Sequence, residues 1–441
     1  MSVEVGSEIT VDVEKAVAGG RMLARHEGRV ALVWGAIPGE RVRARIDRVT
    51  PGVLYAEVAE VLSSSPDRRP ASADWRCGGS VFAHVAYERQ RELKGEIVRD
   101  ALERIGRVPL PAPPPVAGSP EQGYRMRARL HVRDGRLGFY REGTHELCDA
   151  SSTGQLASAT GEWIGEVEEI IARERLTGLA AIEMAENVRG DERACHLELQ
   201  GGTDARAFRP LAAAGPLAGL SAARGDRGEI ELLEGCPGVA DVLHVRADDP
   251  ASTLRLRRDV RAFFQANRFL LEPLARHVVS LLPPGPVVDL YAGVGLFGLA
   301  AAAAGIGPIT LVEGDPVSAA DLAANAEPFL DRVRVERRSV EGFLAAGPQS
   351  VGRVPPRGSP VRAAAPPTFI VDPPRTGMSK QALAGIVSAA PPRLLYVSCD
   401  VATLARDTRT LLDAGYTLDG LTGFDLFPNT AHVESVAVFR R

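Results

Sequence analysis

Hydrophobic and polar residues alternate in short runs along the first 62 residues, and Gly-Gly and Pro-Gly pairs separate these runs. In the run GERVRARIDRV, a period of two places three apolar residues on one face of a strand and three arginines on the other. These are Val42, Ala44 and Ile46 on one face, and Arg41, Arg43 and Arg45 on the other. Several short strands at close spacing predict a small β-barrel over residues 1–62. The arginine face is either a solvated outer surface or an RNA-backbone contact strip.

The pattern is mixed between residues 63 and 260. Residues 63–74 have the composition of a loop, residues 87–106 carry apolar positions at helical spacing, and residues 109–120 form a proline cluster. Two alternating runs then meet at Asp134-Gly135, which predicts a hairpin. Its first strand carries three arginines on one face, Arg125, Arg127 and Arg129. We expect a mixed α+β region whose helix at 87–106 can pack on the C-terminal part of the chain.

From residue 261, helical patterns alternate with buried, β-branched runs, which is typical of a doubly wound parallel sheet in an α/β domain. Two last runs, YTLDGLTGFDLF and ESVAVFRR, can close this sheet as a terminal pair. Residues 347–367 are rich in Pro, Gly and Arg and are predicted to form a mobile insertion. The predicted domains are therefore 1–62, 63–260 and 261–441.

Composition narrows the class of protein. The chain has 441 residues, 45% of them hydrophobic, but no apolar run long enough to cross a bilayer and no secretory signal, so we expect a cytoplasmic globular protein. Its formal net charge of -4 implies that any nucleic acid is held by local basic patches. Its five cysteines are scattered without a C-x-x-C pair, which argues against both a disulfide framework and a structural zinc site.

A glycine-rich turn is the first candidate site. Gly293, Gly295 and Gly298 match G-x-G-x-x-G between a predicted strand and a predicted helix. Asp289 precedes the turn, and Glu313 ends the next strand, where a carboxylate can accept ribose hydroxyls. This pattern fits either NAD or S-adenosylmethionine.

Two further strand ends carry candidate chemistry. Asp372 and two prolines follow the run TFIV, and such a rigid turn can present carbonyls and a carboxylate to a flat base. Methyltransferases that act on nucleobases commonly carry this element, so it favours S-adenosylmethionine. Cys399 follows the run LLYVS at the end of another strand, where it is either a small buried residue or a nucleophile.

The segments VDLYAGVGLFGLA, VDPPRTGM, LLYVSCDVATLARD and FPNTAHVESVAVF resemble, in order and spacing, the S-adenosylmethionine-dependent RNA 5-methyluridine methyltransferases. The first 60 residues resemble the TRAM domain, an OB-like RNA-binding barrel. The resemblance implies a Rossmann-like class I methyltransferase domain, preceded by the TRAM barrel and a mixed α+β central domain. It makes Cys399 the nucleophile that adds to carbon 6 of uracil and Glu434 the base that removes the proton from carbon 5. Asp372 and Arg375 are expected to position the uracil and support charge on its oxygen.

The same resemblance implies the cofactor-binding residues. They are Gln265 in FFQAN, Tyr291, Gly293, Gly295, Glu313 and Asp372. At a further acidic position of the family this chain has Ser339, with Glu341 as an alternative. Many members that carry a TRAM domain bind an iron-sulfur cluster through four cysteines, but only Cys77 stands at one of these spacings here. We therefore expect no cluster and no metal, with Cys77 a structural remnant.

Three alternatives stay open. An RNA cytosine methyltransferase would need a second cysteine in the DPPRTG loop, and a methyltransferase for exocyclic nitrogens would not need Cys399 or Glu434. A non-catalytic RNA-binding or RNA-folding protein would keep the barrel but not the methyl-transfer residues. The RNA substrate, rRNA or tRNA, cannot be chosen from the motifs, and a monomer without a stable protein partner is expected.

Overall fold

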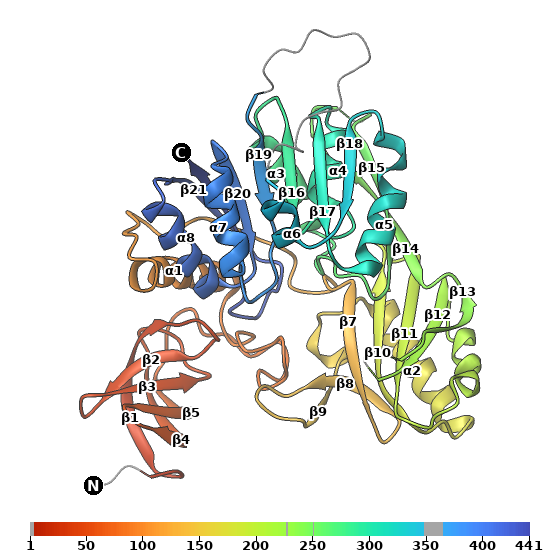
Figure 1. The fold of residues 1–441 in the computed structure, drawn as a ribbon. Coiled ribbons are helices and arrows are strands. Elements are labelled where there is room, and N and C mark those ends of the chain that lie inside the picture. The colour runs from red at the N-terminus through yellow and green to blue at the C-terminus, as the bar shows by residue number, and fades with distance from the viewer. Residues whose placement is uncertain (1–3, 226–227, 250, 348–364) are drawn as a thin grey trace.

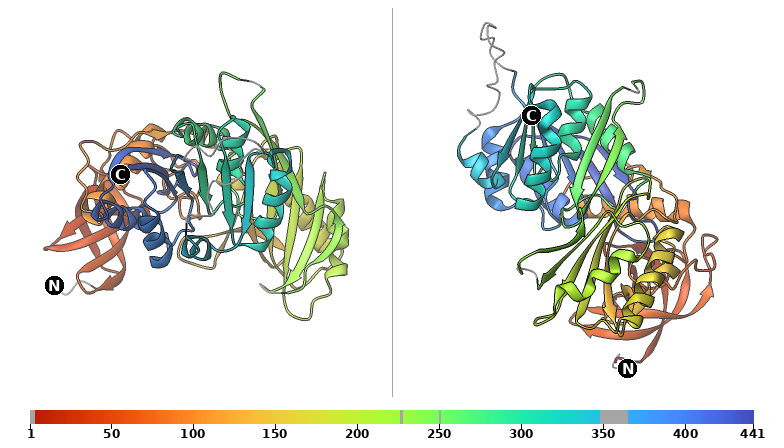
Figure 2. Two further views of the ribbon diagram at one scale, coloured as in Figure 1. Left: turned by 45° about the horizontal axis from the view of Figure 1, so that its top comes forward. Right: turned by 90° about the vertical axis from the view of Figure 1, so that its right-hand side faces the viewer.

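The computed structural model describes residues 4–225, 228–249, 251–347 and 365–441. It contains a closed five-stranded barrel, a seven-stranded sheet, an eight-stranded sheet and a two-stranded hairpin (Figure 1). In the left view of Figure 2, the eight-stranded sheet lies between the barrel and the seven-stranded sheet. This arrangement confirms the predicted class, a barrel followed by an α+β region and an α/β domain.

The barrel has the strand order β1-β2-β3-β5-β4. Its strands are β1 (Glu8–Ala16), β2 (Met22–His26), β3 (Arg29–Trp34), β4 (Arg41–Thr50) and β5 (Val53–Ser63). The burial pattern of β4 alternates as predicted, with Val42, Ala44 and Ile46 buried. These side chains fill the barrel because alternate residues of a strand point to opposite faces.

The seven-stranded sheet has the order β13-β12-β11-β10-β7-β8-β9. Its strands are β7 (Arg127–Arg133), β8 (Arg136–Tyr140), β9 (Leu147–Asp149), β10 (Leu179–Glu186), β11 (Arg193–Leu199), β12 (Gly219–Arg224) and β13 (Glu231–Gly235). Helix α2 (Ser158–Arg173) and the 3-10 helices η1 (Ser151–Thr153) and η2 (Ala205–Ala213) accompany it. The predicted β7–β8 hairpin is confirmed, and both turn residues, Asp134 and Gly135, have positive φ, as a two-residue hairpin turn requires.

The eight-stranded sheet has the order β18-β17-β16-β19-β20-β22-β21-β6. Its strands are β6 (Val116–Ala117), β16 (Val287–Leu290), β17 (Ile309–Glu313), β18 (Val333–Arg337), β19 (Thr368–Val371), β20 (Arg393–Ser398), β21 (Thr417–Phe424) and β22 (Glu434–Arg440). The five strands from β18 to β20 are parallel, whereas β22 runs antiparallel to β20 and to β21. The predicted terminal pair therefore closes the sheet, and β6 from the proline cluster adds a strand that the sequence did not predict.

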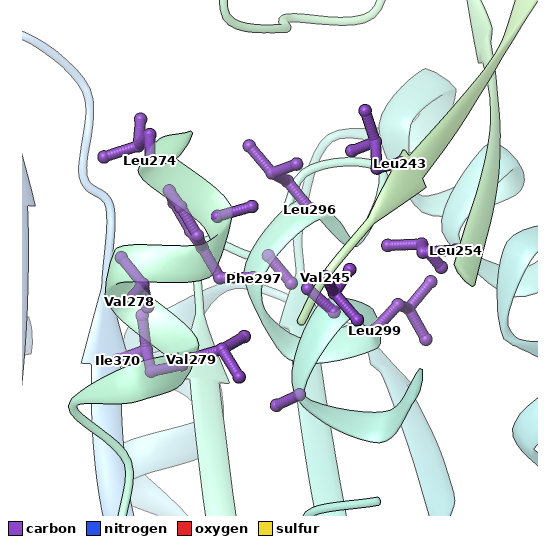
Figure 3. Packing of buried hydrophobic residues seen from close by; sticks show 14 of the residues in the cluster. Leu243, Val245, Leu254, Leu274, Val278, Val279, Leu296, Phe297, Leu299 and Ile370 are labelled. Atoms are coloured by element: carbon purple, nitrogen blue, oxygen red, sulfur yellow. The ribbon is translucent and has the colours of Figure 1, made fainter. Parts of the chain in front are cut away.

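Helices flank the eight-stranded sheet (Figure 1). They are α3 (Leu271–Ser280), α4 (Leu296–Ala303), α5 (Pro316–Ala326), α6 (Val340–Ala345), α7 (Lys380–Ala389) and α8 (Val401–Asp413), with the 3-10 helix η3 (Glu327–Phe329) after α5. Figure 3 shows leucine, valine and phenylalanine side chains of α3 and α4 packed together with Ile370 of β19. The hairpin β14 (Gly238–His244) and β15 (Thr253–Asp259) adds Leu243 and Leu254 to the same core. The predicted boundary between residues 260 and 261 stays a prediction.

Helix α1 (Tyr87–Arg104) confirms the helix predicted over 87–106. It precedes the seven-stranded sheet in the chain but packs against α8 and β6 of the eight-stranded sheet (Figure 1). The cause is its apolar face, because Leu93, Ile97, Val98 and Leu102 are buried.

One expectation from the cysteines was wrong. Cys77 and Cys148 form a disulfide, with a Cα–Cα distance of 6.0 Å, although they are 71 residues apart in sequence. The segment around Cys77 pairs with the end of β8, where Cys77 bridges to Arg141 and the Gly78 amide donates to the Tyr140 carbonyl at 2.9 Å. Cysteine spacing alone could not reveal this pair, because the fold brings the two segments together.

Two further predictions concern long segments. Among the described residues, no helix combines the length and apolar character needed to cross a bilayer. The predicted insertion at 347–367 lies mostly outside the described residues.

Candidate active site

The candidate residues come together at one edge of the eight-stranded sheet. Strands β16, β17, β19 and β20 are parallel, so their carboxyl ends share an edge. The glycine turn follows β16, Glu313 ends β17, Asp372 follows β19 and Cys399 follows β20. The chain order of these elements thus places four separate motifs beside one another.

The glycine turn needs its glycines for different reasons. Gly295 has φ of 105°, and a Cβ there would lie 2.4 Å from Leu299, whereas a Cβ on Gly298 would lie 2.2 Å from Leu311. Gly293 has φ of 56° and nothing within 4 Å of its Cβ position. Gly295 and Gly298 are therefore required for packing, and Gly293 leaves open space at the turn.

Two carboxylates hold the turn. The Gly298 amide donates to Asp289 at 2.8 Å, and the Gly293 amide donates to Glu313 at 2.8 Å. Glu313 also accepts from the Asp315 amide at 2.6 Å. Each carboxylate oxygen can accept a second hydrogen bond, so Glu313 can still receive ribose hydroxyls.

Asp289 is almost fully buried, and its second carboxylate oxygen has no hydrogen-bond partner. Burial raises the pKa of Asp289 to about 8, opposed by the hydrogen bond from Gly298. Burial also raises the pKa of the half-buried Tyr291 hydroxyl. The open space at Gly293 and the free acceptor capacity of Glu313 fit an adenosyl group, and Gln265, Tyr291 and Glu313 would hold it.

Cys399 and Glu434 lie at the meeting point of β20 and β22. The last residue pair of these antiparallel strands is Ser398 and Ser435, and the next position on each strand is Cys399 and Glu434. Burial raises the pKa of the Cys399 thiol to about 12, and Glu434 adds to this rise while Arg375 opposes it. The thiol is thus protonated in the free protein at neutral pH.

The two carboxyl groups of the site influence each other. Glu434 is only 2% exposed, and its Oε1 atom has no hydrogen-bond partner. Burial and then the nearby Asp372 raise the pKa of Glu434, and Arg375 lowers it. Burial raises the pKa of Asp372 to about 7, opposed by a hydrogen bond with Gln265. Two such carboxyls favour sharing one proton, which leaves one of them able to act as a base.

Helix α8 supports the DPPRTG loop, and sequence reasoning did not find the residues responsible. Asp407 accepts from the Met378 amide at 3.1 Å and from the Tyr396 hydroxyl at 2.8 Å. Arg406 donates to the Thr376 carbonyl at 3.2 Å. Arg406 and Asp407 end the motif LLYVSCDVATLARD, but sequence reasoning assigned no role to them. Asp400 caps α8 through the Ala402 and Thr403 amides, which explains the aspartate directly after Cys399.

A groove leads from this site toward the barrel. Its lining includes Arg375 and His432 beside the site and Trp34 of the barrel. It also includes His131 and Tyr140 of the seven-stranded sheet, and Arg125, which precedes β7. The His131 and Tyr140 rings are stacked, with centroids 3.8 Å apart. Sequence analysis had placed Arg125 on an arginine face but had missed the aromatic pair.

The structure places the predicted arginine strip elsewhere. Arg41, Arg43 and Arg45 are exposed on the outer face of β4 and do not line the groove. Arg43 contacts two glutamates, Glu8 and Glu60. Its positive charge is therefore partly neutralised.

The contacts of Ser339 and Glu341 do not show which of the two residues would contact the cofactor. Ser339 caps α6 by accepting from the Gly342 amide at 3.1 Å, and Glu341 accepts from Ser379 at 2.6 Å. Within the described part of the chain, no group of three or more His, Cys, Asp or Glu side chains could hold a metal ion. Cys77 itself is bonded to Cys148.

Comparisons with known proteins identify the family of this chain. The family model described as tRNA (Uracil-5-)-methyltransferase matches residues 252–441, and the TRAM domain model matches residues 2–59. An uncharacterized RNA methyltransferase of Streptomyces coelicolor is 32% identical, over 98% of this chain and 93% of that protein. The 23S rRNA (uracil(1939)-C(5))-methyltransferase RlmD of Halomonas elongata is 31% identical, over 95% of this chain and 86% of that protein.

A solved structure shares the whole fold. The tRNA (uracil-54, C5)-methyltransferase of Pyrococcus abyssi, in complex with S-adenosyl-L-homocysteine, has a TM-score of 0.73 and 23% identity. The match covers 97% of this chain and 99% of that one. The relatives above 30% identity, which match along nearly the whole chain, show that the chain belongs to the RNA (uracil-5-)-methyltransferase family.

Proposed function

We propose that this protein transfers a methyl group from S-adenosylmethionine to carbon 5 of a uridine in RNA. The observation that carries the proposal is the placement of Cys399, directly after β20, next to Glu434, the first residue of β22, with Asp372 and Arg375 nearby. A thiol and a carboxylate in one site supply the nucleophile and the base that this reaction needs. Family membership supports the same reaction.

Cys399 performs the first step. The Cys399 thiol loses its proton to solvent, its thiolate adds to carbon 6 of the uracil, and the electrons of the carbon 5–carbon 6 double bond move toward the carbonyl at carbon 4. Arg375 lies near the thiol and counteracts the rise of its pKa, so it favours the thiolate. Asp372 and Arg375 position the base and support the charge that develops on its oxygen.

Glu434 performs the last step. S-adenosylmethionine supplies the methyl group as an electrophile when it is bound, held by Gln265, Tyr291, the turn at Gly293 and Gly295, and Glu313. After carbon 5 carries the methyl group, Glu434 removes the remaining proton from it. The carbon 5–carbon 6 double bond forms again, the bond between carbon 6 and sulfur breaks, and Cys399 leaves as a thiolate.

The RNA reaches the site through the groove that runs from Trp34 to His432. The stacked rings of His131 and Tyr140 offer an aromatic surface to an unpaired base, and Arg125 adds positive charge. Arg41, Arg43 and Arg45 are proposed as additional backbone contacts on the barrel. We propose that the enzyme acts as a monomer in the cytoplasm, without a stable protein partner.

Nucleoside mass spectrometry tests the function. We expect a strain that lacks this gene to lose 5-methyluridine at one position of its rRNA or tRNA, and the purified protein to restore it. Relatives along nearly the whole chain are named for 23S rRNA, so this RNA is the first substrate to assay. Appearance of 5-methylcytidine instead would favour the cytosine methyltransferase, and RNA binding without any methylation would favour a non-catalytic role.

A further inference from the structure

Helix α1 carries two polar residues on its buried face. It lies between the segments matched by the two family models, residues 2–59 and 252–441. Gln90 and Lys94 are both 0% exposed. A fully buried lysine is rare unless it has a charged partner, so we expect Lys94 to be paired with a buried acidic residue.

Lys94 holds the start of the segment that joins β21 to β22, residues 425–433. Its ammonium group contacts the Asp425 carboxylate and donates to the Phe427 carbonyl at 3.0 Å. Both side chains of the ion pair are 0% exposed. Because an unpaired buried charge is strongly unfavourable, the segment keeps Asp425 next to Lys94.

Gln90 holds the middle of the same segment. Its Oε1 accepts from the Asn429 amide at 2.8 Å, and its Nε2 donates to the Asn429 side chain at 2.9 Å. Asn429 has φ of 63°, a left-handed conformation that is uncommon outside glycine. The two hydrogen bonds to one residue stabilise this turn.

Gln90 also contacts the segment that follows the groove residues Gly78, Gly79 and Val81 in the chain. Its Nε2 lies 3.1 Å from the Phe82 carbonyl and 3.0 Å from the Val85 carbonyl, so its two hydrogens are shared among these two acceptors and the Asn429 side chain. The Phe82 amide donates to the Asn429 carbonyl at 2.8 Å. One side chain thus joins the segment that follows the groove wall to the segment 425–433.

This segment leads directly to Glu434. His432 near its end lines the groove beside Arg375, and its amide donates to Thr430 at 3.1 Å. One carboxylate oxygen of Glu434 has no hydrogen-bond partner, so its backbone matters for its place. The pairing of Glu434 with Phe424 in β21–β22 fixes this backbone from the side of the sheet, and the segment 425–433, which α1 holds, fixes it from the other side.

We propose that Gln90 and Lys94 are positioning residues, which act from outside the methyltransferase domain by fixing the segment 425–433 and thereby aiming Glu434 at carbon 5 of the bound uracil. The inference rests on the proposed function. It predicts that loss of either residue slows the elimination step more than cofactor binding or methyl transfer. If Gln90 and Lys94 only stabilised the fold, their loss would reduce the rate of every step in proportion to the loss of folded protein.

The test compares Gln90→Leu and the double variant Lys94→Met/Asp425→Leu with the wild-type enzyme. The double variant removes both charges together and so avoids an unpaired buried charge. Arg99→Met is the matched control, since Arg99 lies on the same helix with its side chain 39% exposed. Thermal unfolding and calorimetric binding of S-adenosylhomocysteine give the folded fraction of each variant.

Single-turnover assays then separate methyl transfer to RNA from release of the RNA, and denaturing gels detect covalent RNA–protein adduct. We expect both test variants to transfer the methyl group, to accumulate adduct and to release product up to about 100-fold more slowly, the cost of a small misplacement of a catalytic group. Release at the wild-type rate per folded molecule, or loss of every step without adduct, overturns the inference. Glu434→Gln in the same assay distinguishes failure of this inference from failure of the proposed function. If Glu434→Gln does not accumulate adduct, the proposed mechanism is wrong.

Discussion

Cys399 and Glu434 occupy neighbouring positions at the ends of two antiparallel strands. The pairing of β20 with β22 runs from Arg393 and Arg440 to Ser398 and Ser435, and one more step brings the cysteine level with the glutamate. The backbone hydrogen bonds of the sheet therefore define the relation between nucleophile and base. A shift of one residue in this pairing would turn one of the two side chains away.

Cys399→Ala removes the nucleophile. We expect turnover to be lost, while the affinity for S-adenosylhomocysteine stays within about twofold, because the glycine turn at Gly293 and Glu313 do not depend on the thiol. Methylation assays and calorimetry measure the two quantities. Methylation at the wild-type rate would disprove covalent catalysis.

Glu434→Gln keeps the size of the side chain but cannot take a proton. We expect the methyl group to be transferred and a covalent RNA adduct to accumulate, because elimination is blocked. Denaturing gel electrophoresis and intact-mass spectrometry detect the adduct. If this variant releases methylated RNA at the normal rate, another group is the base.

Asp289 makes stability depend on pH. Its folded pKa of about 8 exceeds its ordinary value of about 4, so the folded state binds a proton more tightly than the unfolded state. This stabilisation is complete below about pH 4 and is lost as the pH rises through 8, at about 1.4 kcal/mol for each unit of pKa difference. Asp289→Asn cannot titrate.

We therefore compare the unfolding temperatures at about pH 5 and about pH 9, which lie on either side of this titration. We expect the unfolding temperature to fall more between these two values for the wild-type protein than for Asp289→Asn. Differential scanning calorimetry at both values measures the two slopes. Equal slopes would show that Asp289 does not bind the extra proton.

The Cys77–Cys148 disulfide links the segment after the barrel to β9. Cys77→Ser should lower the free energy of unfolding under oxidising conditions by about 2–4 kcal/mol, because the bond restricts the unfolded chain. The same change should have a smaller effect in the presence of a reductant. Cys236→Ser, at a free cysteine, is the control. Peptide mapping without a linked Cys77–Cys148 fragment would contradict the pairing.

The arginine strip on β4 predicts a salt effect. Replacing Arg41, Arg43 and Arg45 by Gln should reduce the slope of log affinity against log salt by about 0.7 for each RNA phosphate that the protein no longer neutralises. Because Arg43 is paired with Glu8 and Glu60, we expect the change to correspond to about two phosphates and not three. Filter binding at several salt concentrations measures the slope. An unchanged slope would make the strip a solvated surface.

The sequence by itself determined the local structure and most of the candidate site. Alternation with a period of two predicted β4 and the β7–β8 hairpin, and buried runs separated by helices predicted a doubly wound parallel sheet with a terminal strand pair. Carboxyl ends of parallel strands meet at one edge, so the motifs at Gly293, Asp372 and Cys399 could be expected to lie together. Local periodicity and strand direction carry this information without distant contacts.

Only the tertiary structure decided the contacts between distant segments. The pairing of Lys94 with Asp425, 331 residues apart, follows no period in the sequence, and Lys94 there has the pattern of an ordinary helix residue. The same holds for Cys77 with Cys148 and for the stacking of His131 on Tyr140 across a hairpin. Such contacts depend on how whole helices and strands pack against one another. The burial of apolar faces selects this packing, and the packing then brings the polar partners together.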